Sequence, residues 1–301
     1  MQIFKMKKLL TNIFLLILIL VVVDVAFGYA NRYMIKGAKG GQTYCQEYIC
    51  NHSNEDIIMM GSSRMRHHYN PDVIIEGTGM TCYNAGEDGG GIILNYGFYQ
   101  MLIQRYTPKV IIYDLTEFDF YKGDNEKYLG WLRKYYDNSK VKGIIDDISS
   151  TEAIKNISNL YRYNTRCIAT MGDYLHPVRS YNKGFSAIDG IIDYEVIPQK
   201  FSREDVDEVK MKYLIKLIED TRNKGIQLYL FSSPQYEALE GNDYYAPIDS
   251  LSKQYGVSFF NHFYDSDISW HKEFFHDKGH MNGAGANLFS EKVVKDILVN
   301  N

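Results

Sequence analysis

The sequence predicts an α/β domain in which helices cover both faces of a mostly parallel, five-stranded sheet, with one membrane-spanning helix before it. Short apolar runs alternate with segments of helical periodicity, which is typical of this three-layer α/β/α architecture. Polar or glycine residues follow the apolar runs, as expected where buried strands end. A long apolar run behind three lysines near the N-terminus predicts the membrane helix.

The N-terminal apolar run extends from Leu9 to Gly28. Its 20 residues would span about 30 Å as a helix, the thickness of the hydrocarbon core of a bilayer. Lysines before the run keep the N-terminus in the cytoplasm, so residues 31–301 are expected outside it, in the periplasm or at the cell surface. Residues 1–30 fit either a retained anchor, which we favour, or a cleaved signal peptide of a secreted protein, because Ala26-Phe27-Gly28 is an acceptable cleavage site.

Five short apolar runs are expected to form the sheet, at residues 57–60, 81–84, 110–113, 227–231 and 257–260. Helical spacing predicts helices at residues 92–103, 206–218 and 283–298. We expect Ser202, with Asp205 three positions later, to cap the second of these helices, and Asn282 to cap the third.

The chain is expected to form one main domain, residues 55–301, behind a linker at residues 31–54. A segment at about 120–203 interrupts the alternation of strands and helices and is rich in Tyr, Lys, Asp and Asn. It contains short helical patterns near residues 127–136 and 152–164. We interpret it as an insertion above the sheet, without a core of its own.

Composition excludes some functions. The 301 residues are 45% hydrophobic and carry a net charge of -4, so the chain can build a core, and nothing in the charge suggests nucleic acid, whose binding would need a basic stripe. The four cysteines lack zinc spacing, and no metal or cofactor is expected. Cys45 and Cys50 are near enough in sequence to pair across a short loop, which an exported compartment permits.

Ser63 follows the first predicted strand in the sequence Gly61-Ser62-Ser63-Arg64. A serine between a strand and a helix lies where backbone N–H groups converge. Its hydroxyl is a weak nucleophile that needs a base. A plain helix cap is the alternative interpretation of this serine.

Asp277 and His280 lie three positions apart, after the last strand and before the final helix. In a turn, this spacing brings the carboxylate to one imidazole nitrogen and leaves the other nitrogen to take a proton from a serine. Carboxyl ends of parallel strands share one edge of a sheet, so Ser63 and His280 are expected to meet there.

A glycine-rich loop follows the second strand, at residues 84–91. Glycines let backbone N–H groups approach a substrate oxygen, and such donors stabilise the oxyanion of a tetrahedral intermediate. A plain strand-to-helix turn is the alternative, and the loop lacks the phosphate-binding pattern that ends in Gly-Lys-Ser/Thr.

Together these three motifs resemble, in order and position, the blocks of the SGNH, or GDSL-like, hydrolases over most of residues 55–298. The resemblance implies a flavodoxin-like α/β/α fold, Ser63 as the nucleophile, and Asp277 and His280 as its partners. It also implies that the backbone N–H groups of Ser63 and Gly89 hold the oxyanion. One departure is clear, because Phe118 stands where the family has an asparagine donor.

The membrane segment and the Gly-Ser-Ser-Arg motif also resemble extracytoplasmic SGNH-like proteins of polysaccharide O-acetylation and teichoic-acid D-alanylation. That resemblance implies an O-acylated carbohydrate as substrate and a membrane-bound O-acyltransferase as a partner. The expected activity is therefore hydrolysis of acyl esters, with acyl transfer by the same residues as one alternative. A non-catalytic protein that binds a glycan or a partner is the other alternative.

None of the remaining histidines is assigned a catalytic role. His67 and His68 could line the cleft but are interpreted as solvated helix positions, and His276 is a minor competitor of His280 for the role of base. Arg64 or a polar residue of the insertion is a candidate to replace the missing asparagine donor. The sequence leaves the acyl group, the acceptor and the oligomeric state open.

Overall fold

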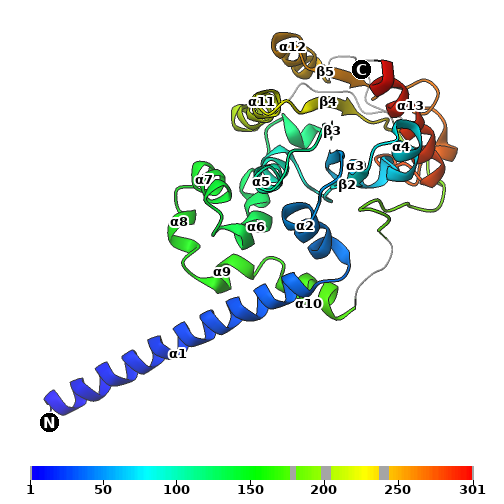
Figure 1. Cartoon of the computed structure of the whole chain (residues 1–301). Coiled ribbons are helices and arrows are strands. Elements are labelled where there is room, and N and C mark those ends of the chain that lie inside the picture. The colour runs from blue at the N-terminus through cyan, green and yellow to red at the C-terminus, as the bar shows by residue number, and fades with distance from the viewer. Residues whose placement is uncertain (1, 177–180, 198–204, 237–243, 300–301) are drawn as a thin grey trace.

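The computed structural model of the chain describes residues 2–176, 181–197, 205–236 and 244–299. Its centre is one sheet of five parallel strands in the order β2-β1-β3-β4-β5 (Figure 1). The strands are β1 (Ile57–Gly61), β2 (Cys82–Asn84), β3 (Val110–Asp114), β4 (Gln227–Ser232) and β5 (Ser258–Asn261). The predicted five-stranded parallel sheet is therefore confirmed.

Helices cover both faces of the sheet. One face carries α3 (Ser63–His68), α4 (Pro71–Thr78) and α13 (Gly283–Val299). The other carries α5 (Ile92–Leu102), α11 (Glu208–Asn223) and α12 (Ala246–Tyr255). Neighbouring strand residues point to opposite faces, so Ile57 and Met59 belong to the first core and Ile58 and Met60 to the second. Burial on both faces explains why residues 57–60 of β1 and 110–113 of β3 are continuous apolar runs.

Polar side chains mark where the helices begin. Asn282 caps α13, because its Oδ1 accepts two backbone N–H groups of the first turn at 3.1 Å. The predicted start of the helix after the insertion is wrong. That helix, α11, begins at Glu208, and Asp207 caps it by accepting the N–H groups of Val209 and Lys210. Ser202 lies outside the described residues.

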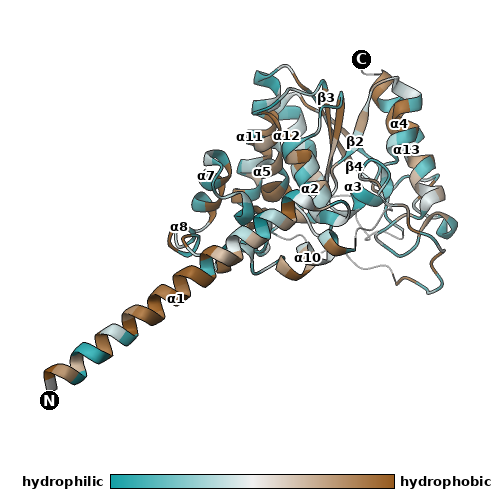
Figure 2. Cartoon of the chain, turned by 60° about the horizontal axis from the view of Figure 1, so that its bottom comes forward, coloured by the Kyte–Doolittle hydropathy of each residue, from teal (hydrophilic) through white to brown (hydrophobic). Residues whose placement is uncertain are grey.

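The N-terminal helix α1 (Gln2–Gly37) is long and apolar enough to cross a membrane, by length and composition. Figure 2 shows its apolar half extending away from the domain. Residues 31–54, expected to be a linker, instead complete α1 and form α2 (Gly41–Asn51), which packs on α5. Gly40 and Gly41, at the start of α2, are typical of a loop. The sequence therefore shows no sign of this short helix, which has a buried face.

The suggested disulfide is wrong. Cys45 and Cys50 are free thiols buried in α2. They lie five positions apart, and side chains at this spacing point to different sides of a helix and do not meet. Burial raises the pKa of Cys45 to about 11 and that of Cys50 to about 12, so both stay protonated at neutral pH. The two residues therefore behave as small apolar groups of the core.

Between β3 and α11 the chain forms short helices, including α6 (Leu129–Leu132), α7 (Ser139–Ile148), α8 (Glu152–Lys155), α9 (Asn159–Tyr163) and α10 (Cys167–Leu175). The first two pack on α5, beside the main core. Residues 181–197 return to the opposite side of the molecule, where the N–H group of Ser186 bonds to the carbonyl of Arg66 in α3. Residues 177–180 and 198–203 of the expected insertion lie outside the described residues.

The loop after β5 is tied to α13 through one carboxylate. Asp265 accepts hydrogen bonds from Nδ1 of His262 at 3.0 Å and from Nζ of Lys292 at 3.0 Å. Burial alone would raise its pKa, but these bonds outweigh burial and lower the pKa of Asp265 to about 2. The contact therefore stabilises the folded state above the ordinary carboxyl pKa of 3.8, and this contribution is lost as the pH falls toward 2.

We expect Asp265→Asn to lower the free energy of unfolding by about 2 kcal/mol near neutral pH. The difference from the wild type should shrink as the pH falls from about 4 to about 2, because the wild-type carboxylate is then protonated as well. Urea unfolding at several pH values measures both effects. A difference that stays constant over this acid range would contradict the assignment.

Candidate active site

Ser63 stands at the turn from β1 into α3, at the carboxyl end of a central strand. Gly61 has φ of 154°, and a Cβ atom there would lie 2.8 Å from the carbonyl oxygen of Asp114, so this tight turn requires glycine. Ser62 caps α3, with its hydroxyl accepting the N–H of Arg64 at 3.3 Å. β1 lies between β2 and β3, where the strand order reverses, which is the usual ligand position in such sheets.

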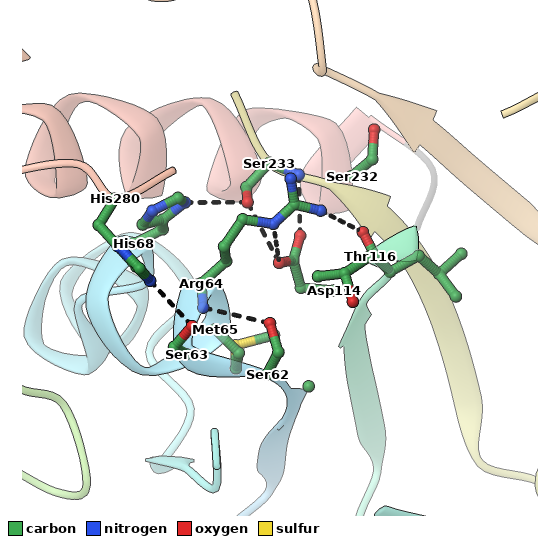
Figure 3. A network of polar contacts seen from close by, with 12 residues as sticks. Ser62, Ser63, Arg64, Met65, His68, Asp114, Thr116, Ser232, Ser233 and His280 are labelled. Atoms are coloured by element: carbon green, nitrogen blue, oxygen red, sulfur yellow. Dashed lines mark hydrogen bonds and ion pairs between the residues drawn. The ribbon is translucent and has the colours of Figure 1, made fainter. Parts of the chain in front are cut away.

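The loop before α13 brings two further predicted residues to Ser63. Oγ of Ser63 lies 2.9 Å from Nε2 of His280 (Figure 3). Nδ1 of His280 lies 3.0 Å from both carboxylate oxygens of Asp277. Since Asp277 is bonded at Nδ1, the neutral imidazole carries its proton there, and Nε2 is able to take a proton from the Ser63 hydroxyl.

Asp277 is held by its own loop. The backbone N–H groups of Gly279 and His280 donate to its Oδ1 at 2.8 and 2.9 Å. Partial burial alone would raise its pKa, but the bonds from the His280 side chain and the backbone outweigh burial and lower the pKa of Asp277 to about 2. The side chain is therefore ionised at neutral pH and stabilises the imidazolium that forms when His280 accepts a proton.

The glycine-rich loop between β2 and α5 is anchored beside the same turn. The N–H of Glu87 donates to the carbonyl of Gly61 at 3.0 Å, and Nδ2 of Asn84 donates to two carbonyl groups in and after α3 at 2.7 and 2.9 Å. Gly89 has φ of 69°, which favours glycine, and no described atom lies within 4 Å of the position of a Cβ. Its role as an oxyanion donor beside Ser63 stays a prediction.

A chain of polar contacts, which sequence analysis missed, connects the strand ends to the His280 loop (Figure 3). The N–H of Met281 donates to Nε2 of His68 at 3.0 Å. Because Nε2 accepts, Nδ1 carries the proton and donates to Oγ of Ser233 at 2.9 Å, and Ser233 donates to Asp114 at 3.1 Å. Burial lowers the pKa of His68 well below its ordinary value, so His68 stays neutral. His68 is thus a positioning residue, because it holds the backbone of Met281, the residue that follows His280.

We expect His68→Ala to reduce kcat by about 10- to 100-fold with little change in KM, because a small displacement of a catalytic group costs this much. The Met281 N–H loses its acceptor, so the loop holding His280 is no longer fixed against α3. Steady-state kinetics with a water-soluble activated ester measures the change.

His68→Gln is the matched variant, since its amide oxygen can still accept the Met281 N–H. We expect it to retain more activity than His68→Ala. An unchanged kcat in His68→Ala, or equal rates in the two variants, would show that the contact has no positioning role.

The expectation that His67 and His68 are solvated is wrong. His68 is fully buried, and His67 is largely buried with its ring centroid 5.6 Å from that of His280. Burial also lowers the pKa of His67, whose Nδ1 lies 2.6 Å from the carbonyl of Ser186. His276 bonds instead to the carbonyl of Asp189 at 2.7 Å. His67 therefore lines the site, while His276 is directed to a different segment.

The position of the missing asparagine donor is apolar. Phe118 is 40% exposed, and the Nζ of Lys127 lies 4.8 Å from its ring. Arg64, one candidate for a replacement donor, is buried and points toward the ends of β3 and β4 (Figure 3). Its Nη2 donates to the carbonyl of Leu115 at 2.6 Å and to a tyrosine hydroxyl at 3.0 Å. Arg64 therefore holds the end of β3 and does not replace the donor.

No protein-family profile and no curated protein sequence matches the chain. Among solved structures, it is similar to a protein assigned to the lipolytic G-D-S-L family from Desulfitobacterium hafniense, with 10% identity and a TM-score of 0.43 over 80% of this chain and 99% of that one. It is also similar to a protein assigned as an acylhydrolase from Bacteroides fragilis, with 10% identity and a TM-score of 0.42 over 85% and 96% of the two chains. A GDSL-like lipase from Bacteroides thetaiotaomicron shows 12% identity and a TM-score of 0.38 over 90% and 99%.

Proposed function

We propose that the chain is a serine hydrolase that cleaves acyl esters. The observation that carries this proposal is the 2.9 Å contact between Oγ of Ser63 and Nε2 of His280, with Asp277 bonded to the other imidazole nitrogen. A serine hydroxyl becomes a nucleophile when such a base removes its proton. The resemblance of the motifs to those of the SGNH hydrolases points to the same chemistry.

The reaction would proceed in two steps. Ser63 Oγ attacks the acyl carbonyl carbon and passes its proton to Nε2 of His280, and the carbonyl oxygen becomes an oxyanion. The carbon–oxygen bond to the leaving alcohol then breaks, and His280 returns the proton to that alcohol. Water attacks the resulting acyl-serine with His280 again as the base, which releases the carboxylic acid and restores Ser63.

The backbone N–H groups of Ser63 and Gly89 are the proposed donors to the oxyanion. A third donor of the usual kind is replaced by Phe118, and loss of one such donor costs about 2–4 kcal/mol of transition-state stabilisation. A lower turnover than in an enzyme with all three donors follows from this difference.

The proposed substrate is an O-acylated carbohydrate of the cell surface, at the periplasm or the exterior. The N-terminal apolar helix behind three lysines supports this location, since positive residues stay in the cytoplasm. The resemblance to O-acetylation proteins supports the carbohydrate and implies a membrane-bound O-acyltransferase as a partner. Residues 1–30 would then be the anchor and residues 55–301 the catalytic domain with its insertion.

Hydrolysis is favoured over acyl transfer because the site is open. The side chains of His280 and Asp277 are 30% and 36% exposed, so water can reach an acyl-serine beside them. Acyl transfer to a sugar hydroxyl would use the same residues and would require an acceptor that excludes this water. A non-catalytic binding role is supported only by Phe118.

The test uses the full chain in detergent with an activated acetyl ester, with and without an oligosaccharide acceptor. Mass spectrometry should detect free acid in both reactions and a transient acetyl group on Ser63. Acetylated sugar as the main product would assign the chain as a transferase instead. If free acid, acetylated Ser63 and acetylated sugar were all absent, the result would support the non-catalytic alternative.

A further inference from the structure

α1 consists of two halves that differ in their contacts. Residues 3–23 are exposed on every side of the helix. From Asp24 onward one stripe is covered, with Gly28, Asn31 and Ile35 buried at the spacing of a helix face. α9 and α10 lie against this second half (Figure 1). The second half is therefore part of the folded domain, while the apolar half is free to enter a membrane.

Asp24 joins these two halves and binds α9. Its carboxylate accepts the backbone N–H groups of Asn159 and Leu160, each at 2.9 Å, and the hydroxyl of Ser158 at 2.6 Å. It thereby satisfies the free N–H groups in the first turn of α9. One turn later, a Cβ at Gly28 would lie 2.4 Å from the side chain of Asn159, so glycine permits the close approach. α9 is thus fixed at the level of Asp24.

The length of the apolar half determines where the membrane surface falls. Leu9–Val23 has 15 residues, about 22 Å of helix, whereas the hydrocarbon core is about 30 Å thick. Residues 24–28 must supply the missing length, which brings the α9 contacts to the outer edge of the core. The four hydrogen bonds that Asp24 accepts from Ser158, Asn159 and Leu160 make its carboxylate tolerable at this depth.

The segment held at this depth exposes large apolar side chains. Ile154 is 75% exposed, and Ile157 and Ile168 are each 78% exposed. Neighbouring positions of the same kind are Leu160, Met171 and Leu175. Large apolar side chains exposed at several positions of one segment, residues 154–175, indicate a site of interaction.

We propose that α8–α10 form a membrane-docking surface that lies in the interface of the same bilayer that α1 crosses. In this arrangement Ile154, Ile157 and Ile168 insert among the lipid chains, while Asp24 locks the surface to the anchor. The occupant is the lipid surface itself, because the exposed apolar half of α1 continues directly into the half of the helix on which α9 and α10 pack.

Two further features fit a lipid interface. Tyr29 and Tyr33 are 67% and 69% exposed on α1 just beyond the expected core edge, where aromatic residues gather in membrane proteins. The docking segment also carries Lys155, whose side chain is 43% exposed, and basic residues beside apolar ones bind anionic headgroups. The proposal does not depend on catalysis. It implies that the anchor is retained, since cleavage after Gly28 would remove the contacts of Asp24 and Gly28 to α9.

The test places single tryptophans in the full chain, reconstituted in nanodiscs of phosphatidylcholine and phosphatidylglycerol. Ile157→Trp and Ile168→Trp report on the docking surface, and the parent protein gives the background of its two tryptophans. The control is Leu298→Trp, at an exposed position near the end of α13, far from α8–α10 (Figure 1). Each variant is compared in ordinary lipids and in lipids whose chains are brominated near the headgroup.

We expect bromine to quench Ile157→Trp and Ile168→Trp, with Leu298→Trp quenched no more than the parent. Asp24→Ala should reduce quenching at both positions and speed hydrogen exchange of the Asn159 and Leu160 amides, while turnover of a soluble ester is retained. Quenching at the two positions no greater than in the control would overturn the proposal and leave the surface to a protein partner. If hydrogen exchange of the Asn159 and Leu160 amides were unchanged in Asp24→Ala, the proposal that Asp24 holds the docking surface to α1 would be wrong.

Discussion

Ser63→Ala is expected to abolish turnover of an activated acyl ester, with kcat/KM falling by about 10⁴-fold or more. The variant removes the hydroxyl that we propose forms the acyl-enzyme, while alanine preserves the turn from β1 into α3. His280→Ala should cause a loss of similar size, because Oγ of Ser63 then has no base at 2.9 Å. Initial rates of the full chain in detergent measure both effects.

His276→Ala is the matched control for His280→Ala. His276 lies four positions earlier in the same loop but bonds to the carbonyl of Asp189. We expect this variant to keep most of the activity. If Ser63→Ala, His280→Ala and His276→Ala all retained equal rates, the assignment of the nucleophile and the base would be wrong.

Asp277→Asn is expected to lower kcat by about 10⁴-fold with little change in KM, by analogy with loss of the carboxylate in serine proteases. An asparagine amide can donate to Nδ1 of His280, which favours the tautomer with its proton on Nε2. That tautomer cannot accept the proton of Ser63. Because the pKa of Asp277 is lowered to about 2, Asp277 stays ionised over the working pH range, and its own titration should add no step to the acid limb of the wild-type pH–rate profile.

Asp265→Asn is the control for this substitution. Asp265 also lies three positions from a histidine and bonds to it at 3.0 Å, yet it belongs to the loop that ties β5 to α13. We expect this variant to lose stability and to keep its kcat. A similar loss of kcat in both variants would mean that Asp277→Asn acts through folding, and a two-step acid limb in the wild type would contradict the ionised state of Asp277.

The central strands could be predicted from sequence because they contain short apolar runs that are buried on both faces. Residues 57–60 of β1 and 110–113 of β3 are buried, and these runs are continuous and easy to find. α2 was missed because its segment begins with glycines, and α4 and α12 have only short apolar faces. The cap of α11 was misplaced because Asp207 and Ser202 are both good cap residues, and only the observed start of the helix distinguishes them.

The site was predicted through residues that follow strands or precede helices. The same reasoning identified Ser63 and His280 but passed over Asp114, which ends β3, and Ser233, which follows β4. Polar residues directly after buried strands were the signal that could have found them. His68 carried no such signal, because its role depends on the approach of the Met281 N–H from a loop far away in the chain.

The sequence by itself determined which segments are strands and which apolar run is fit to enter a membrane, because both follow from local hydrophobic pattern. It also identified the serine, histidine and aspartate, because their residue types and their places beside the strands limit their chemistry. Only the tertiary structure decided that Ser63 and His280 meet, that His68 supports the loop carrying His280, and that Asp24 holds α9. Each of these contacts joins residues that are far apart in the chain. Whether such residues come within hydrogen-bond distance depends on how the helices and strands pack, and a local sequence pattern does not contain that information.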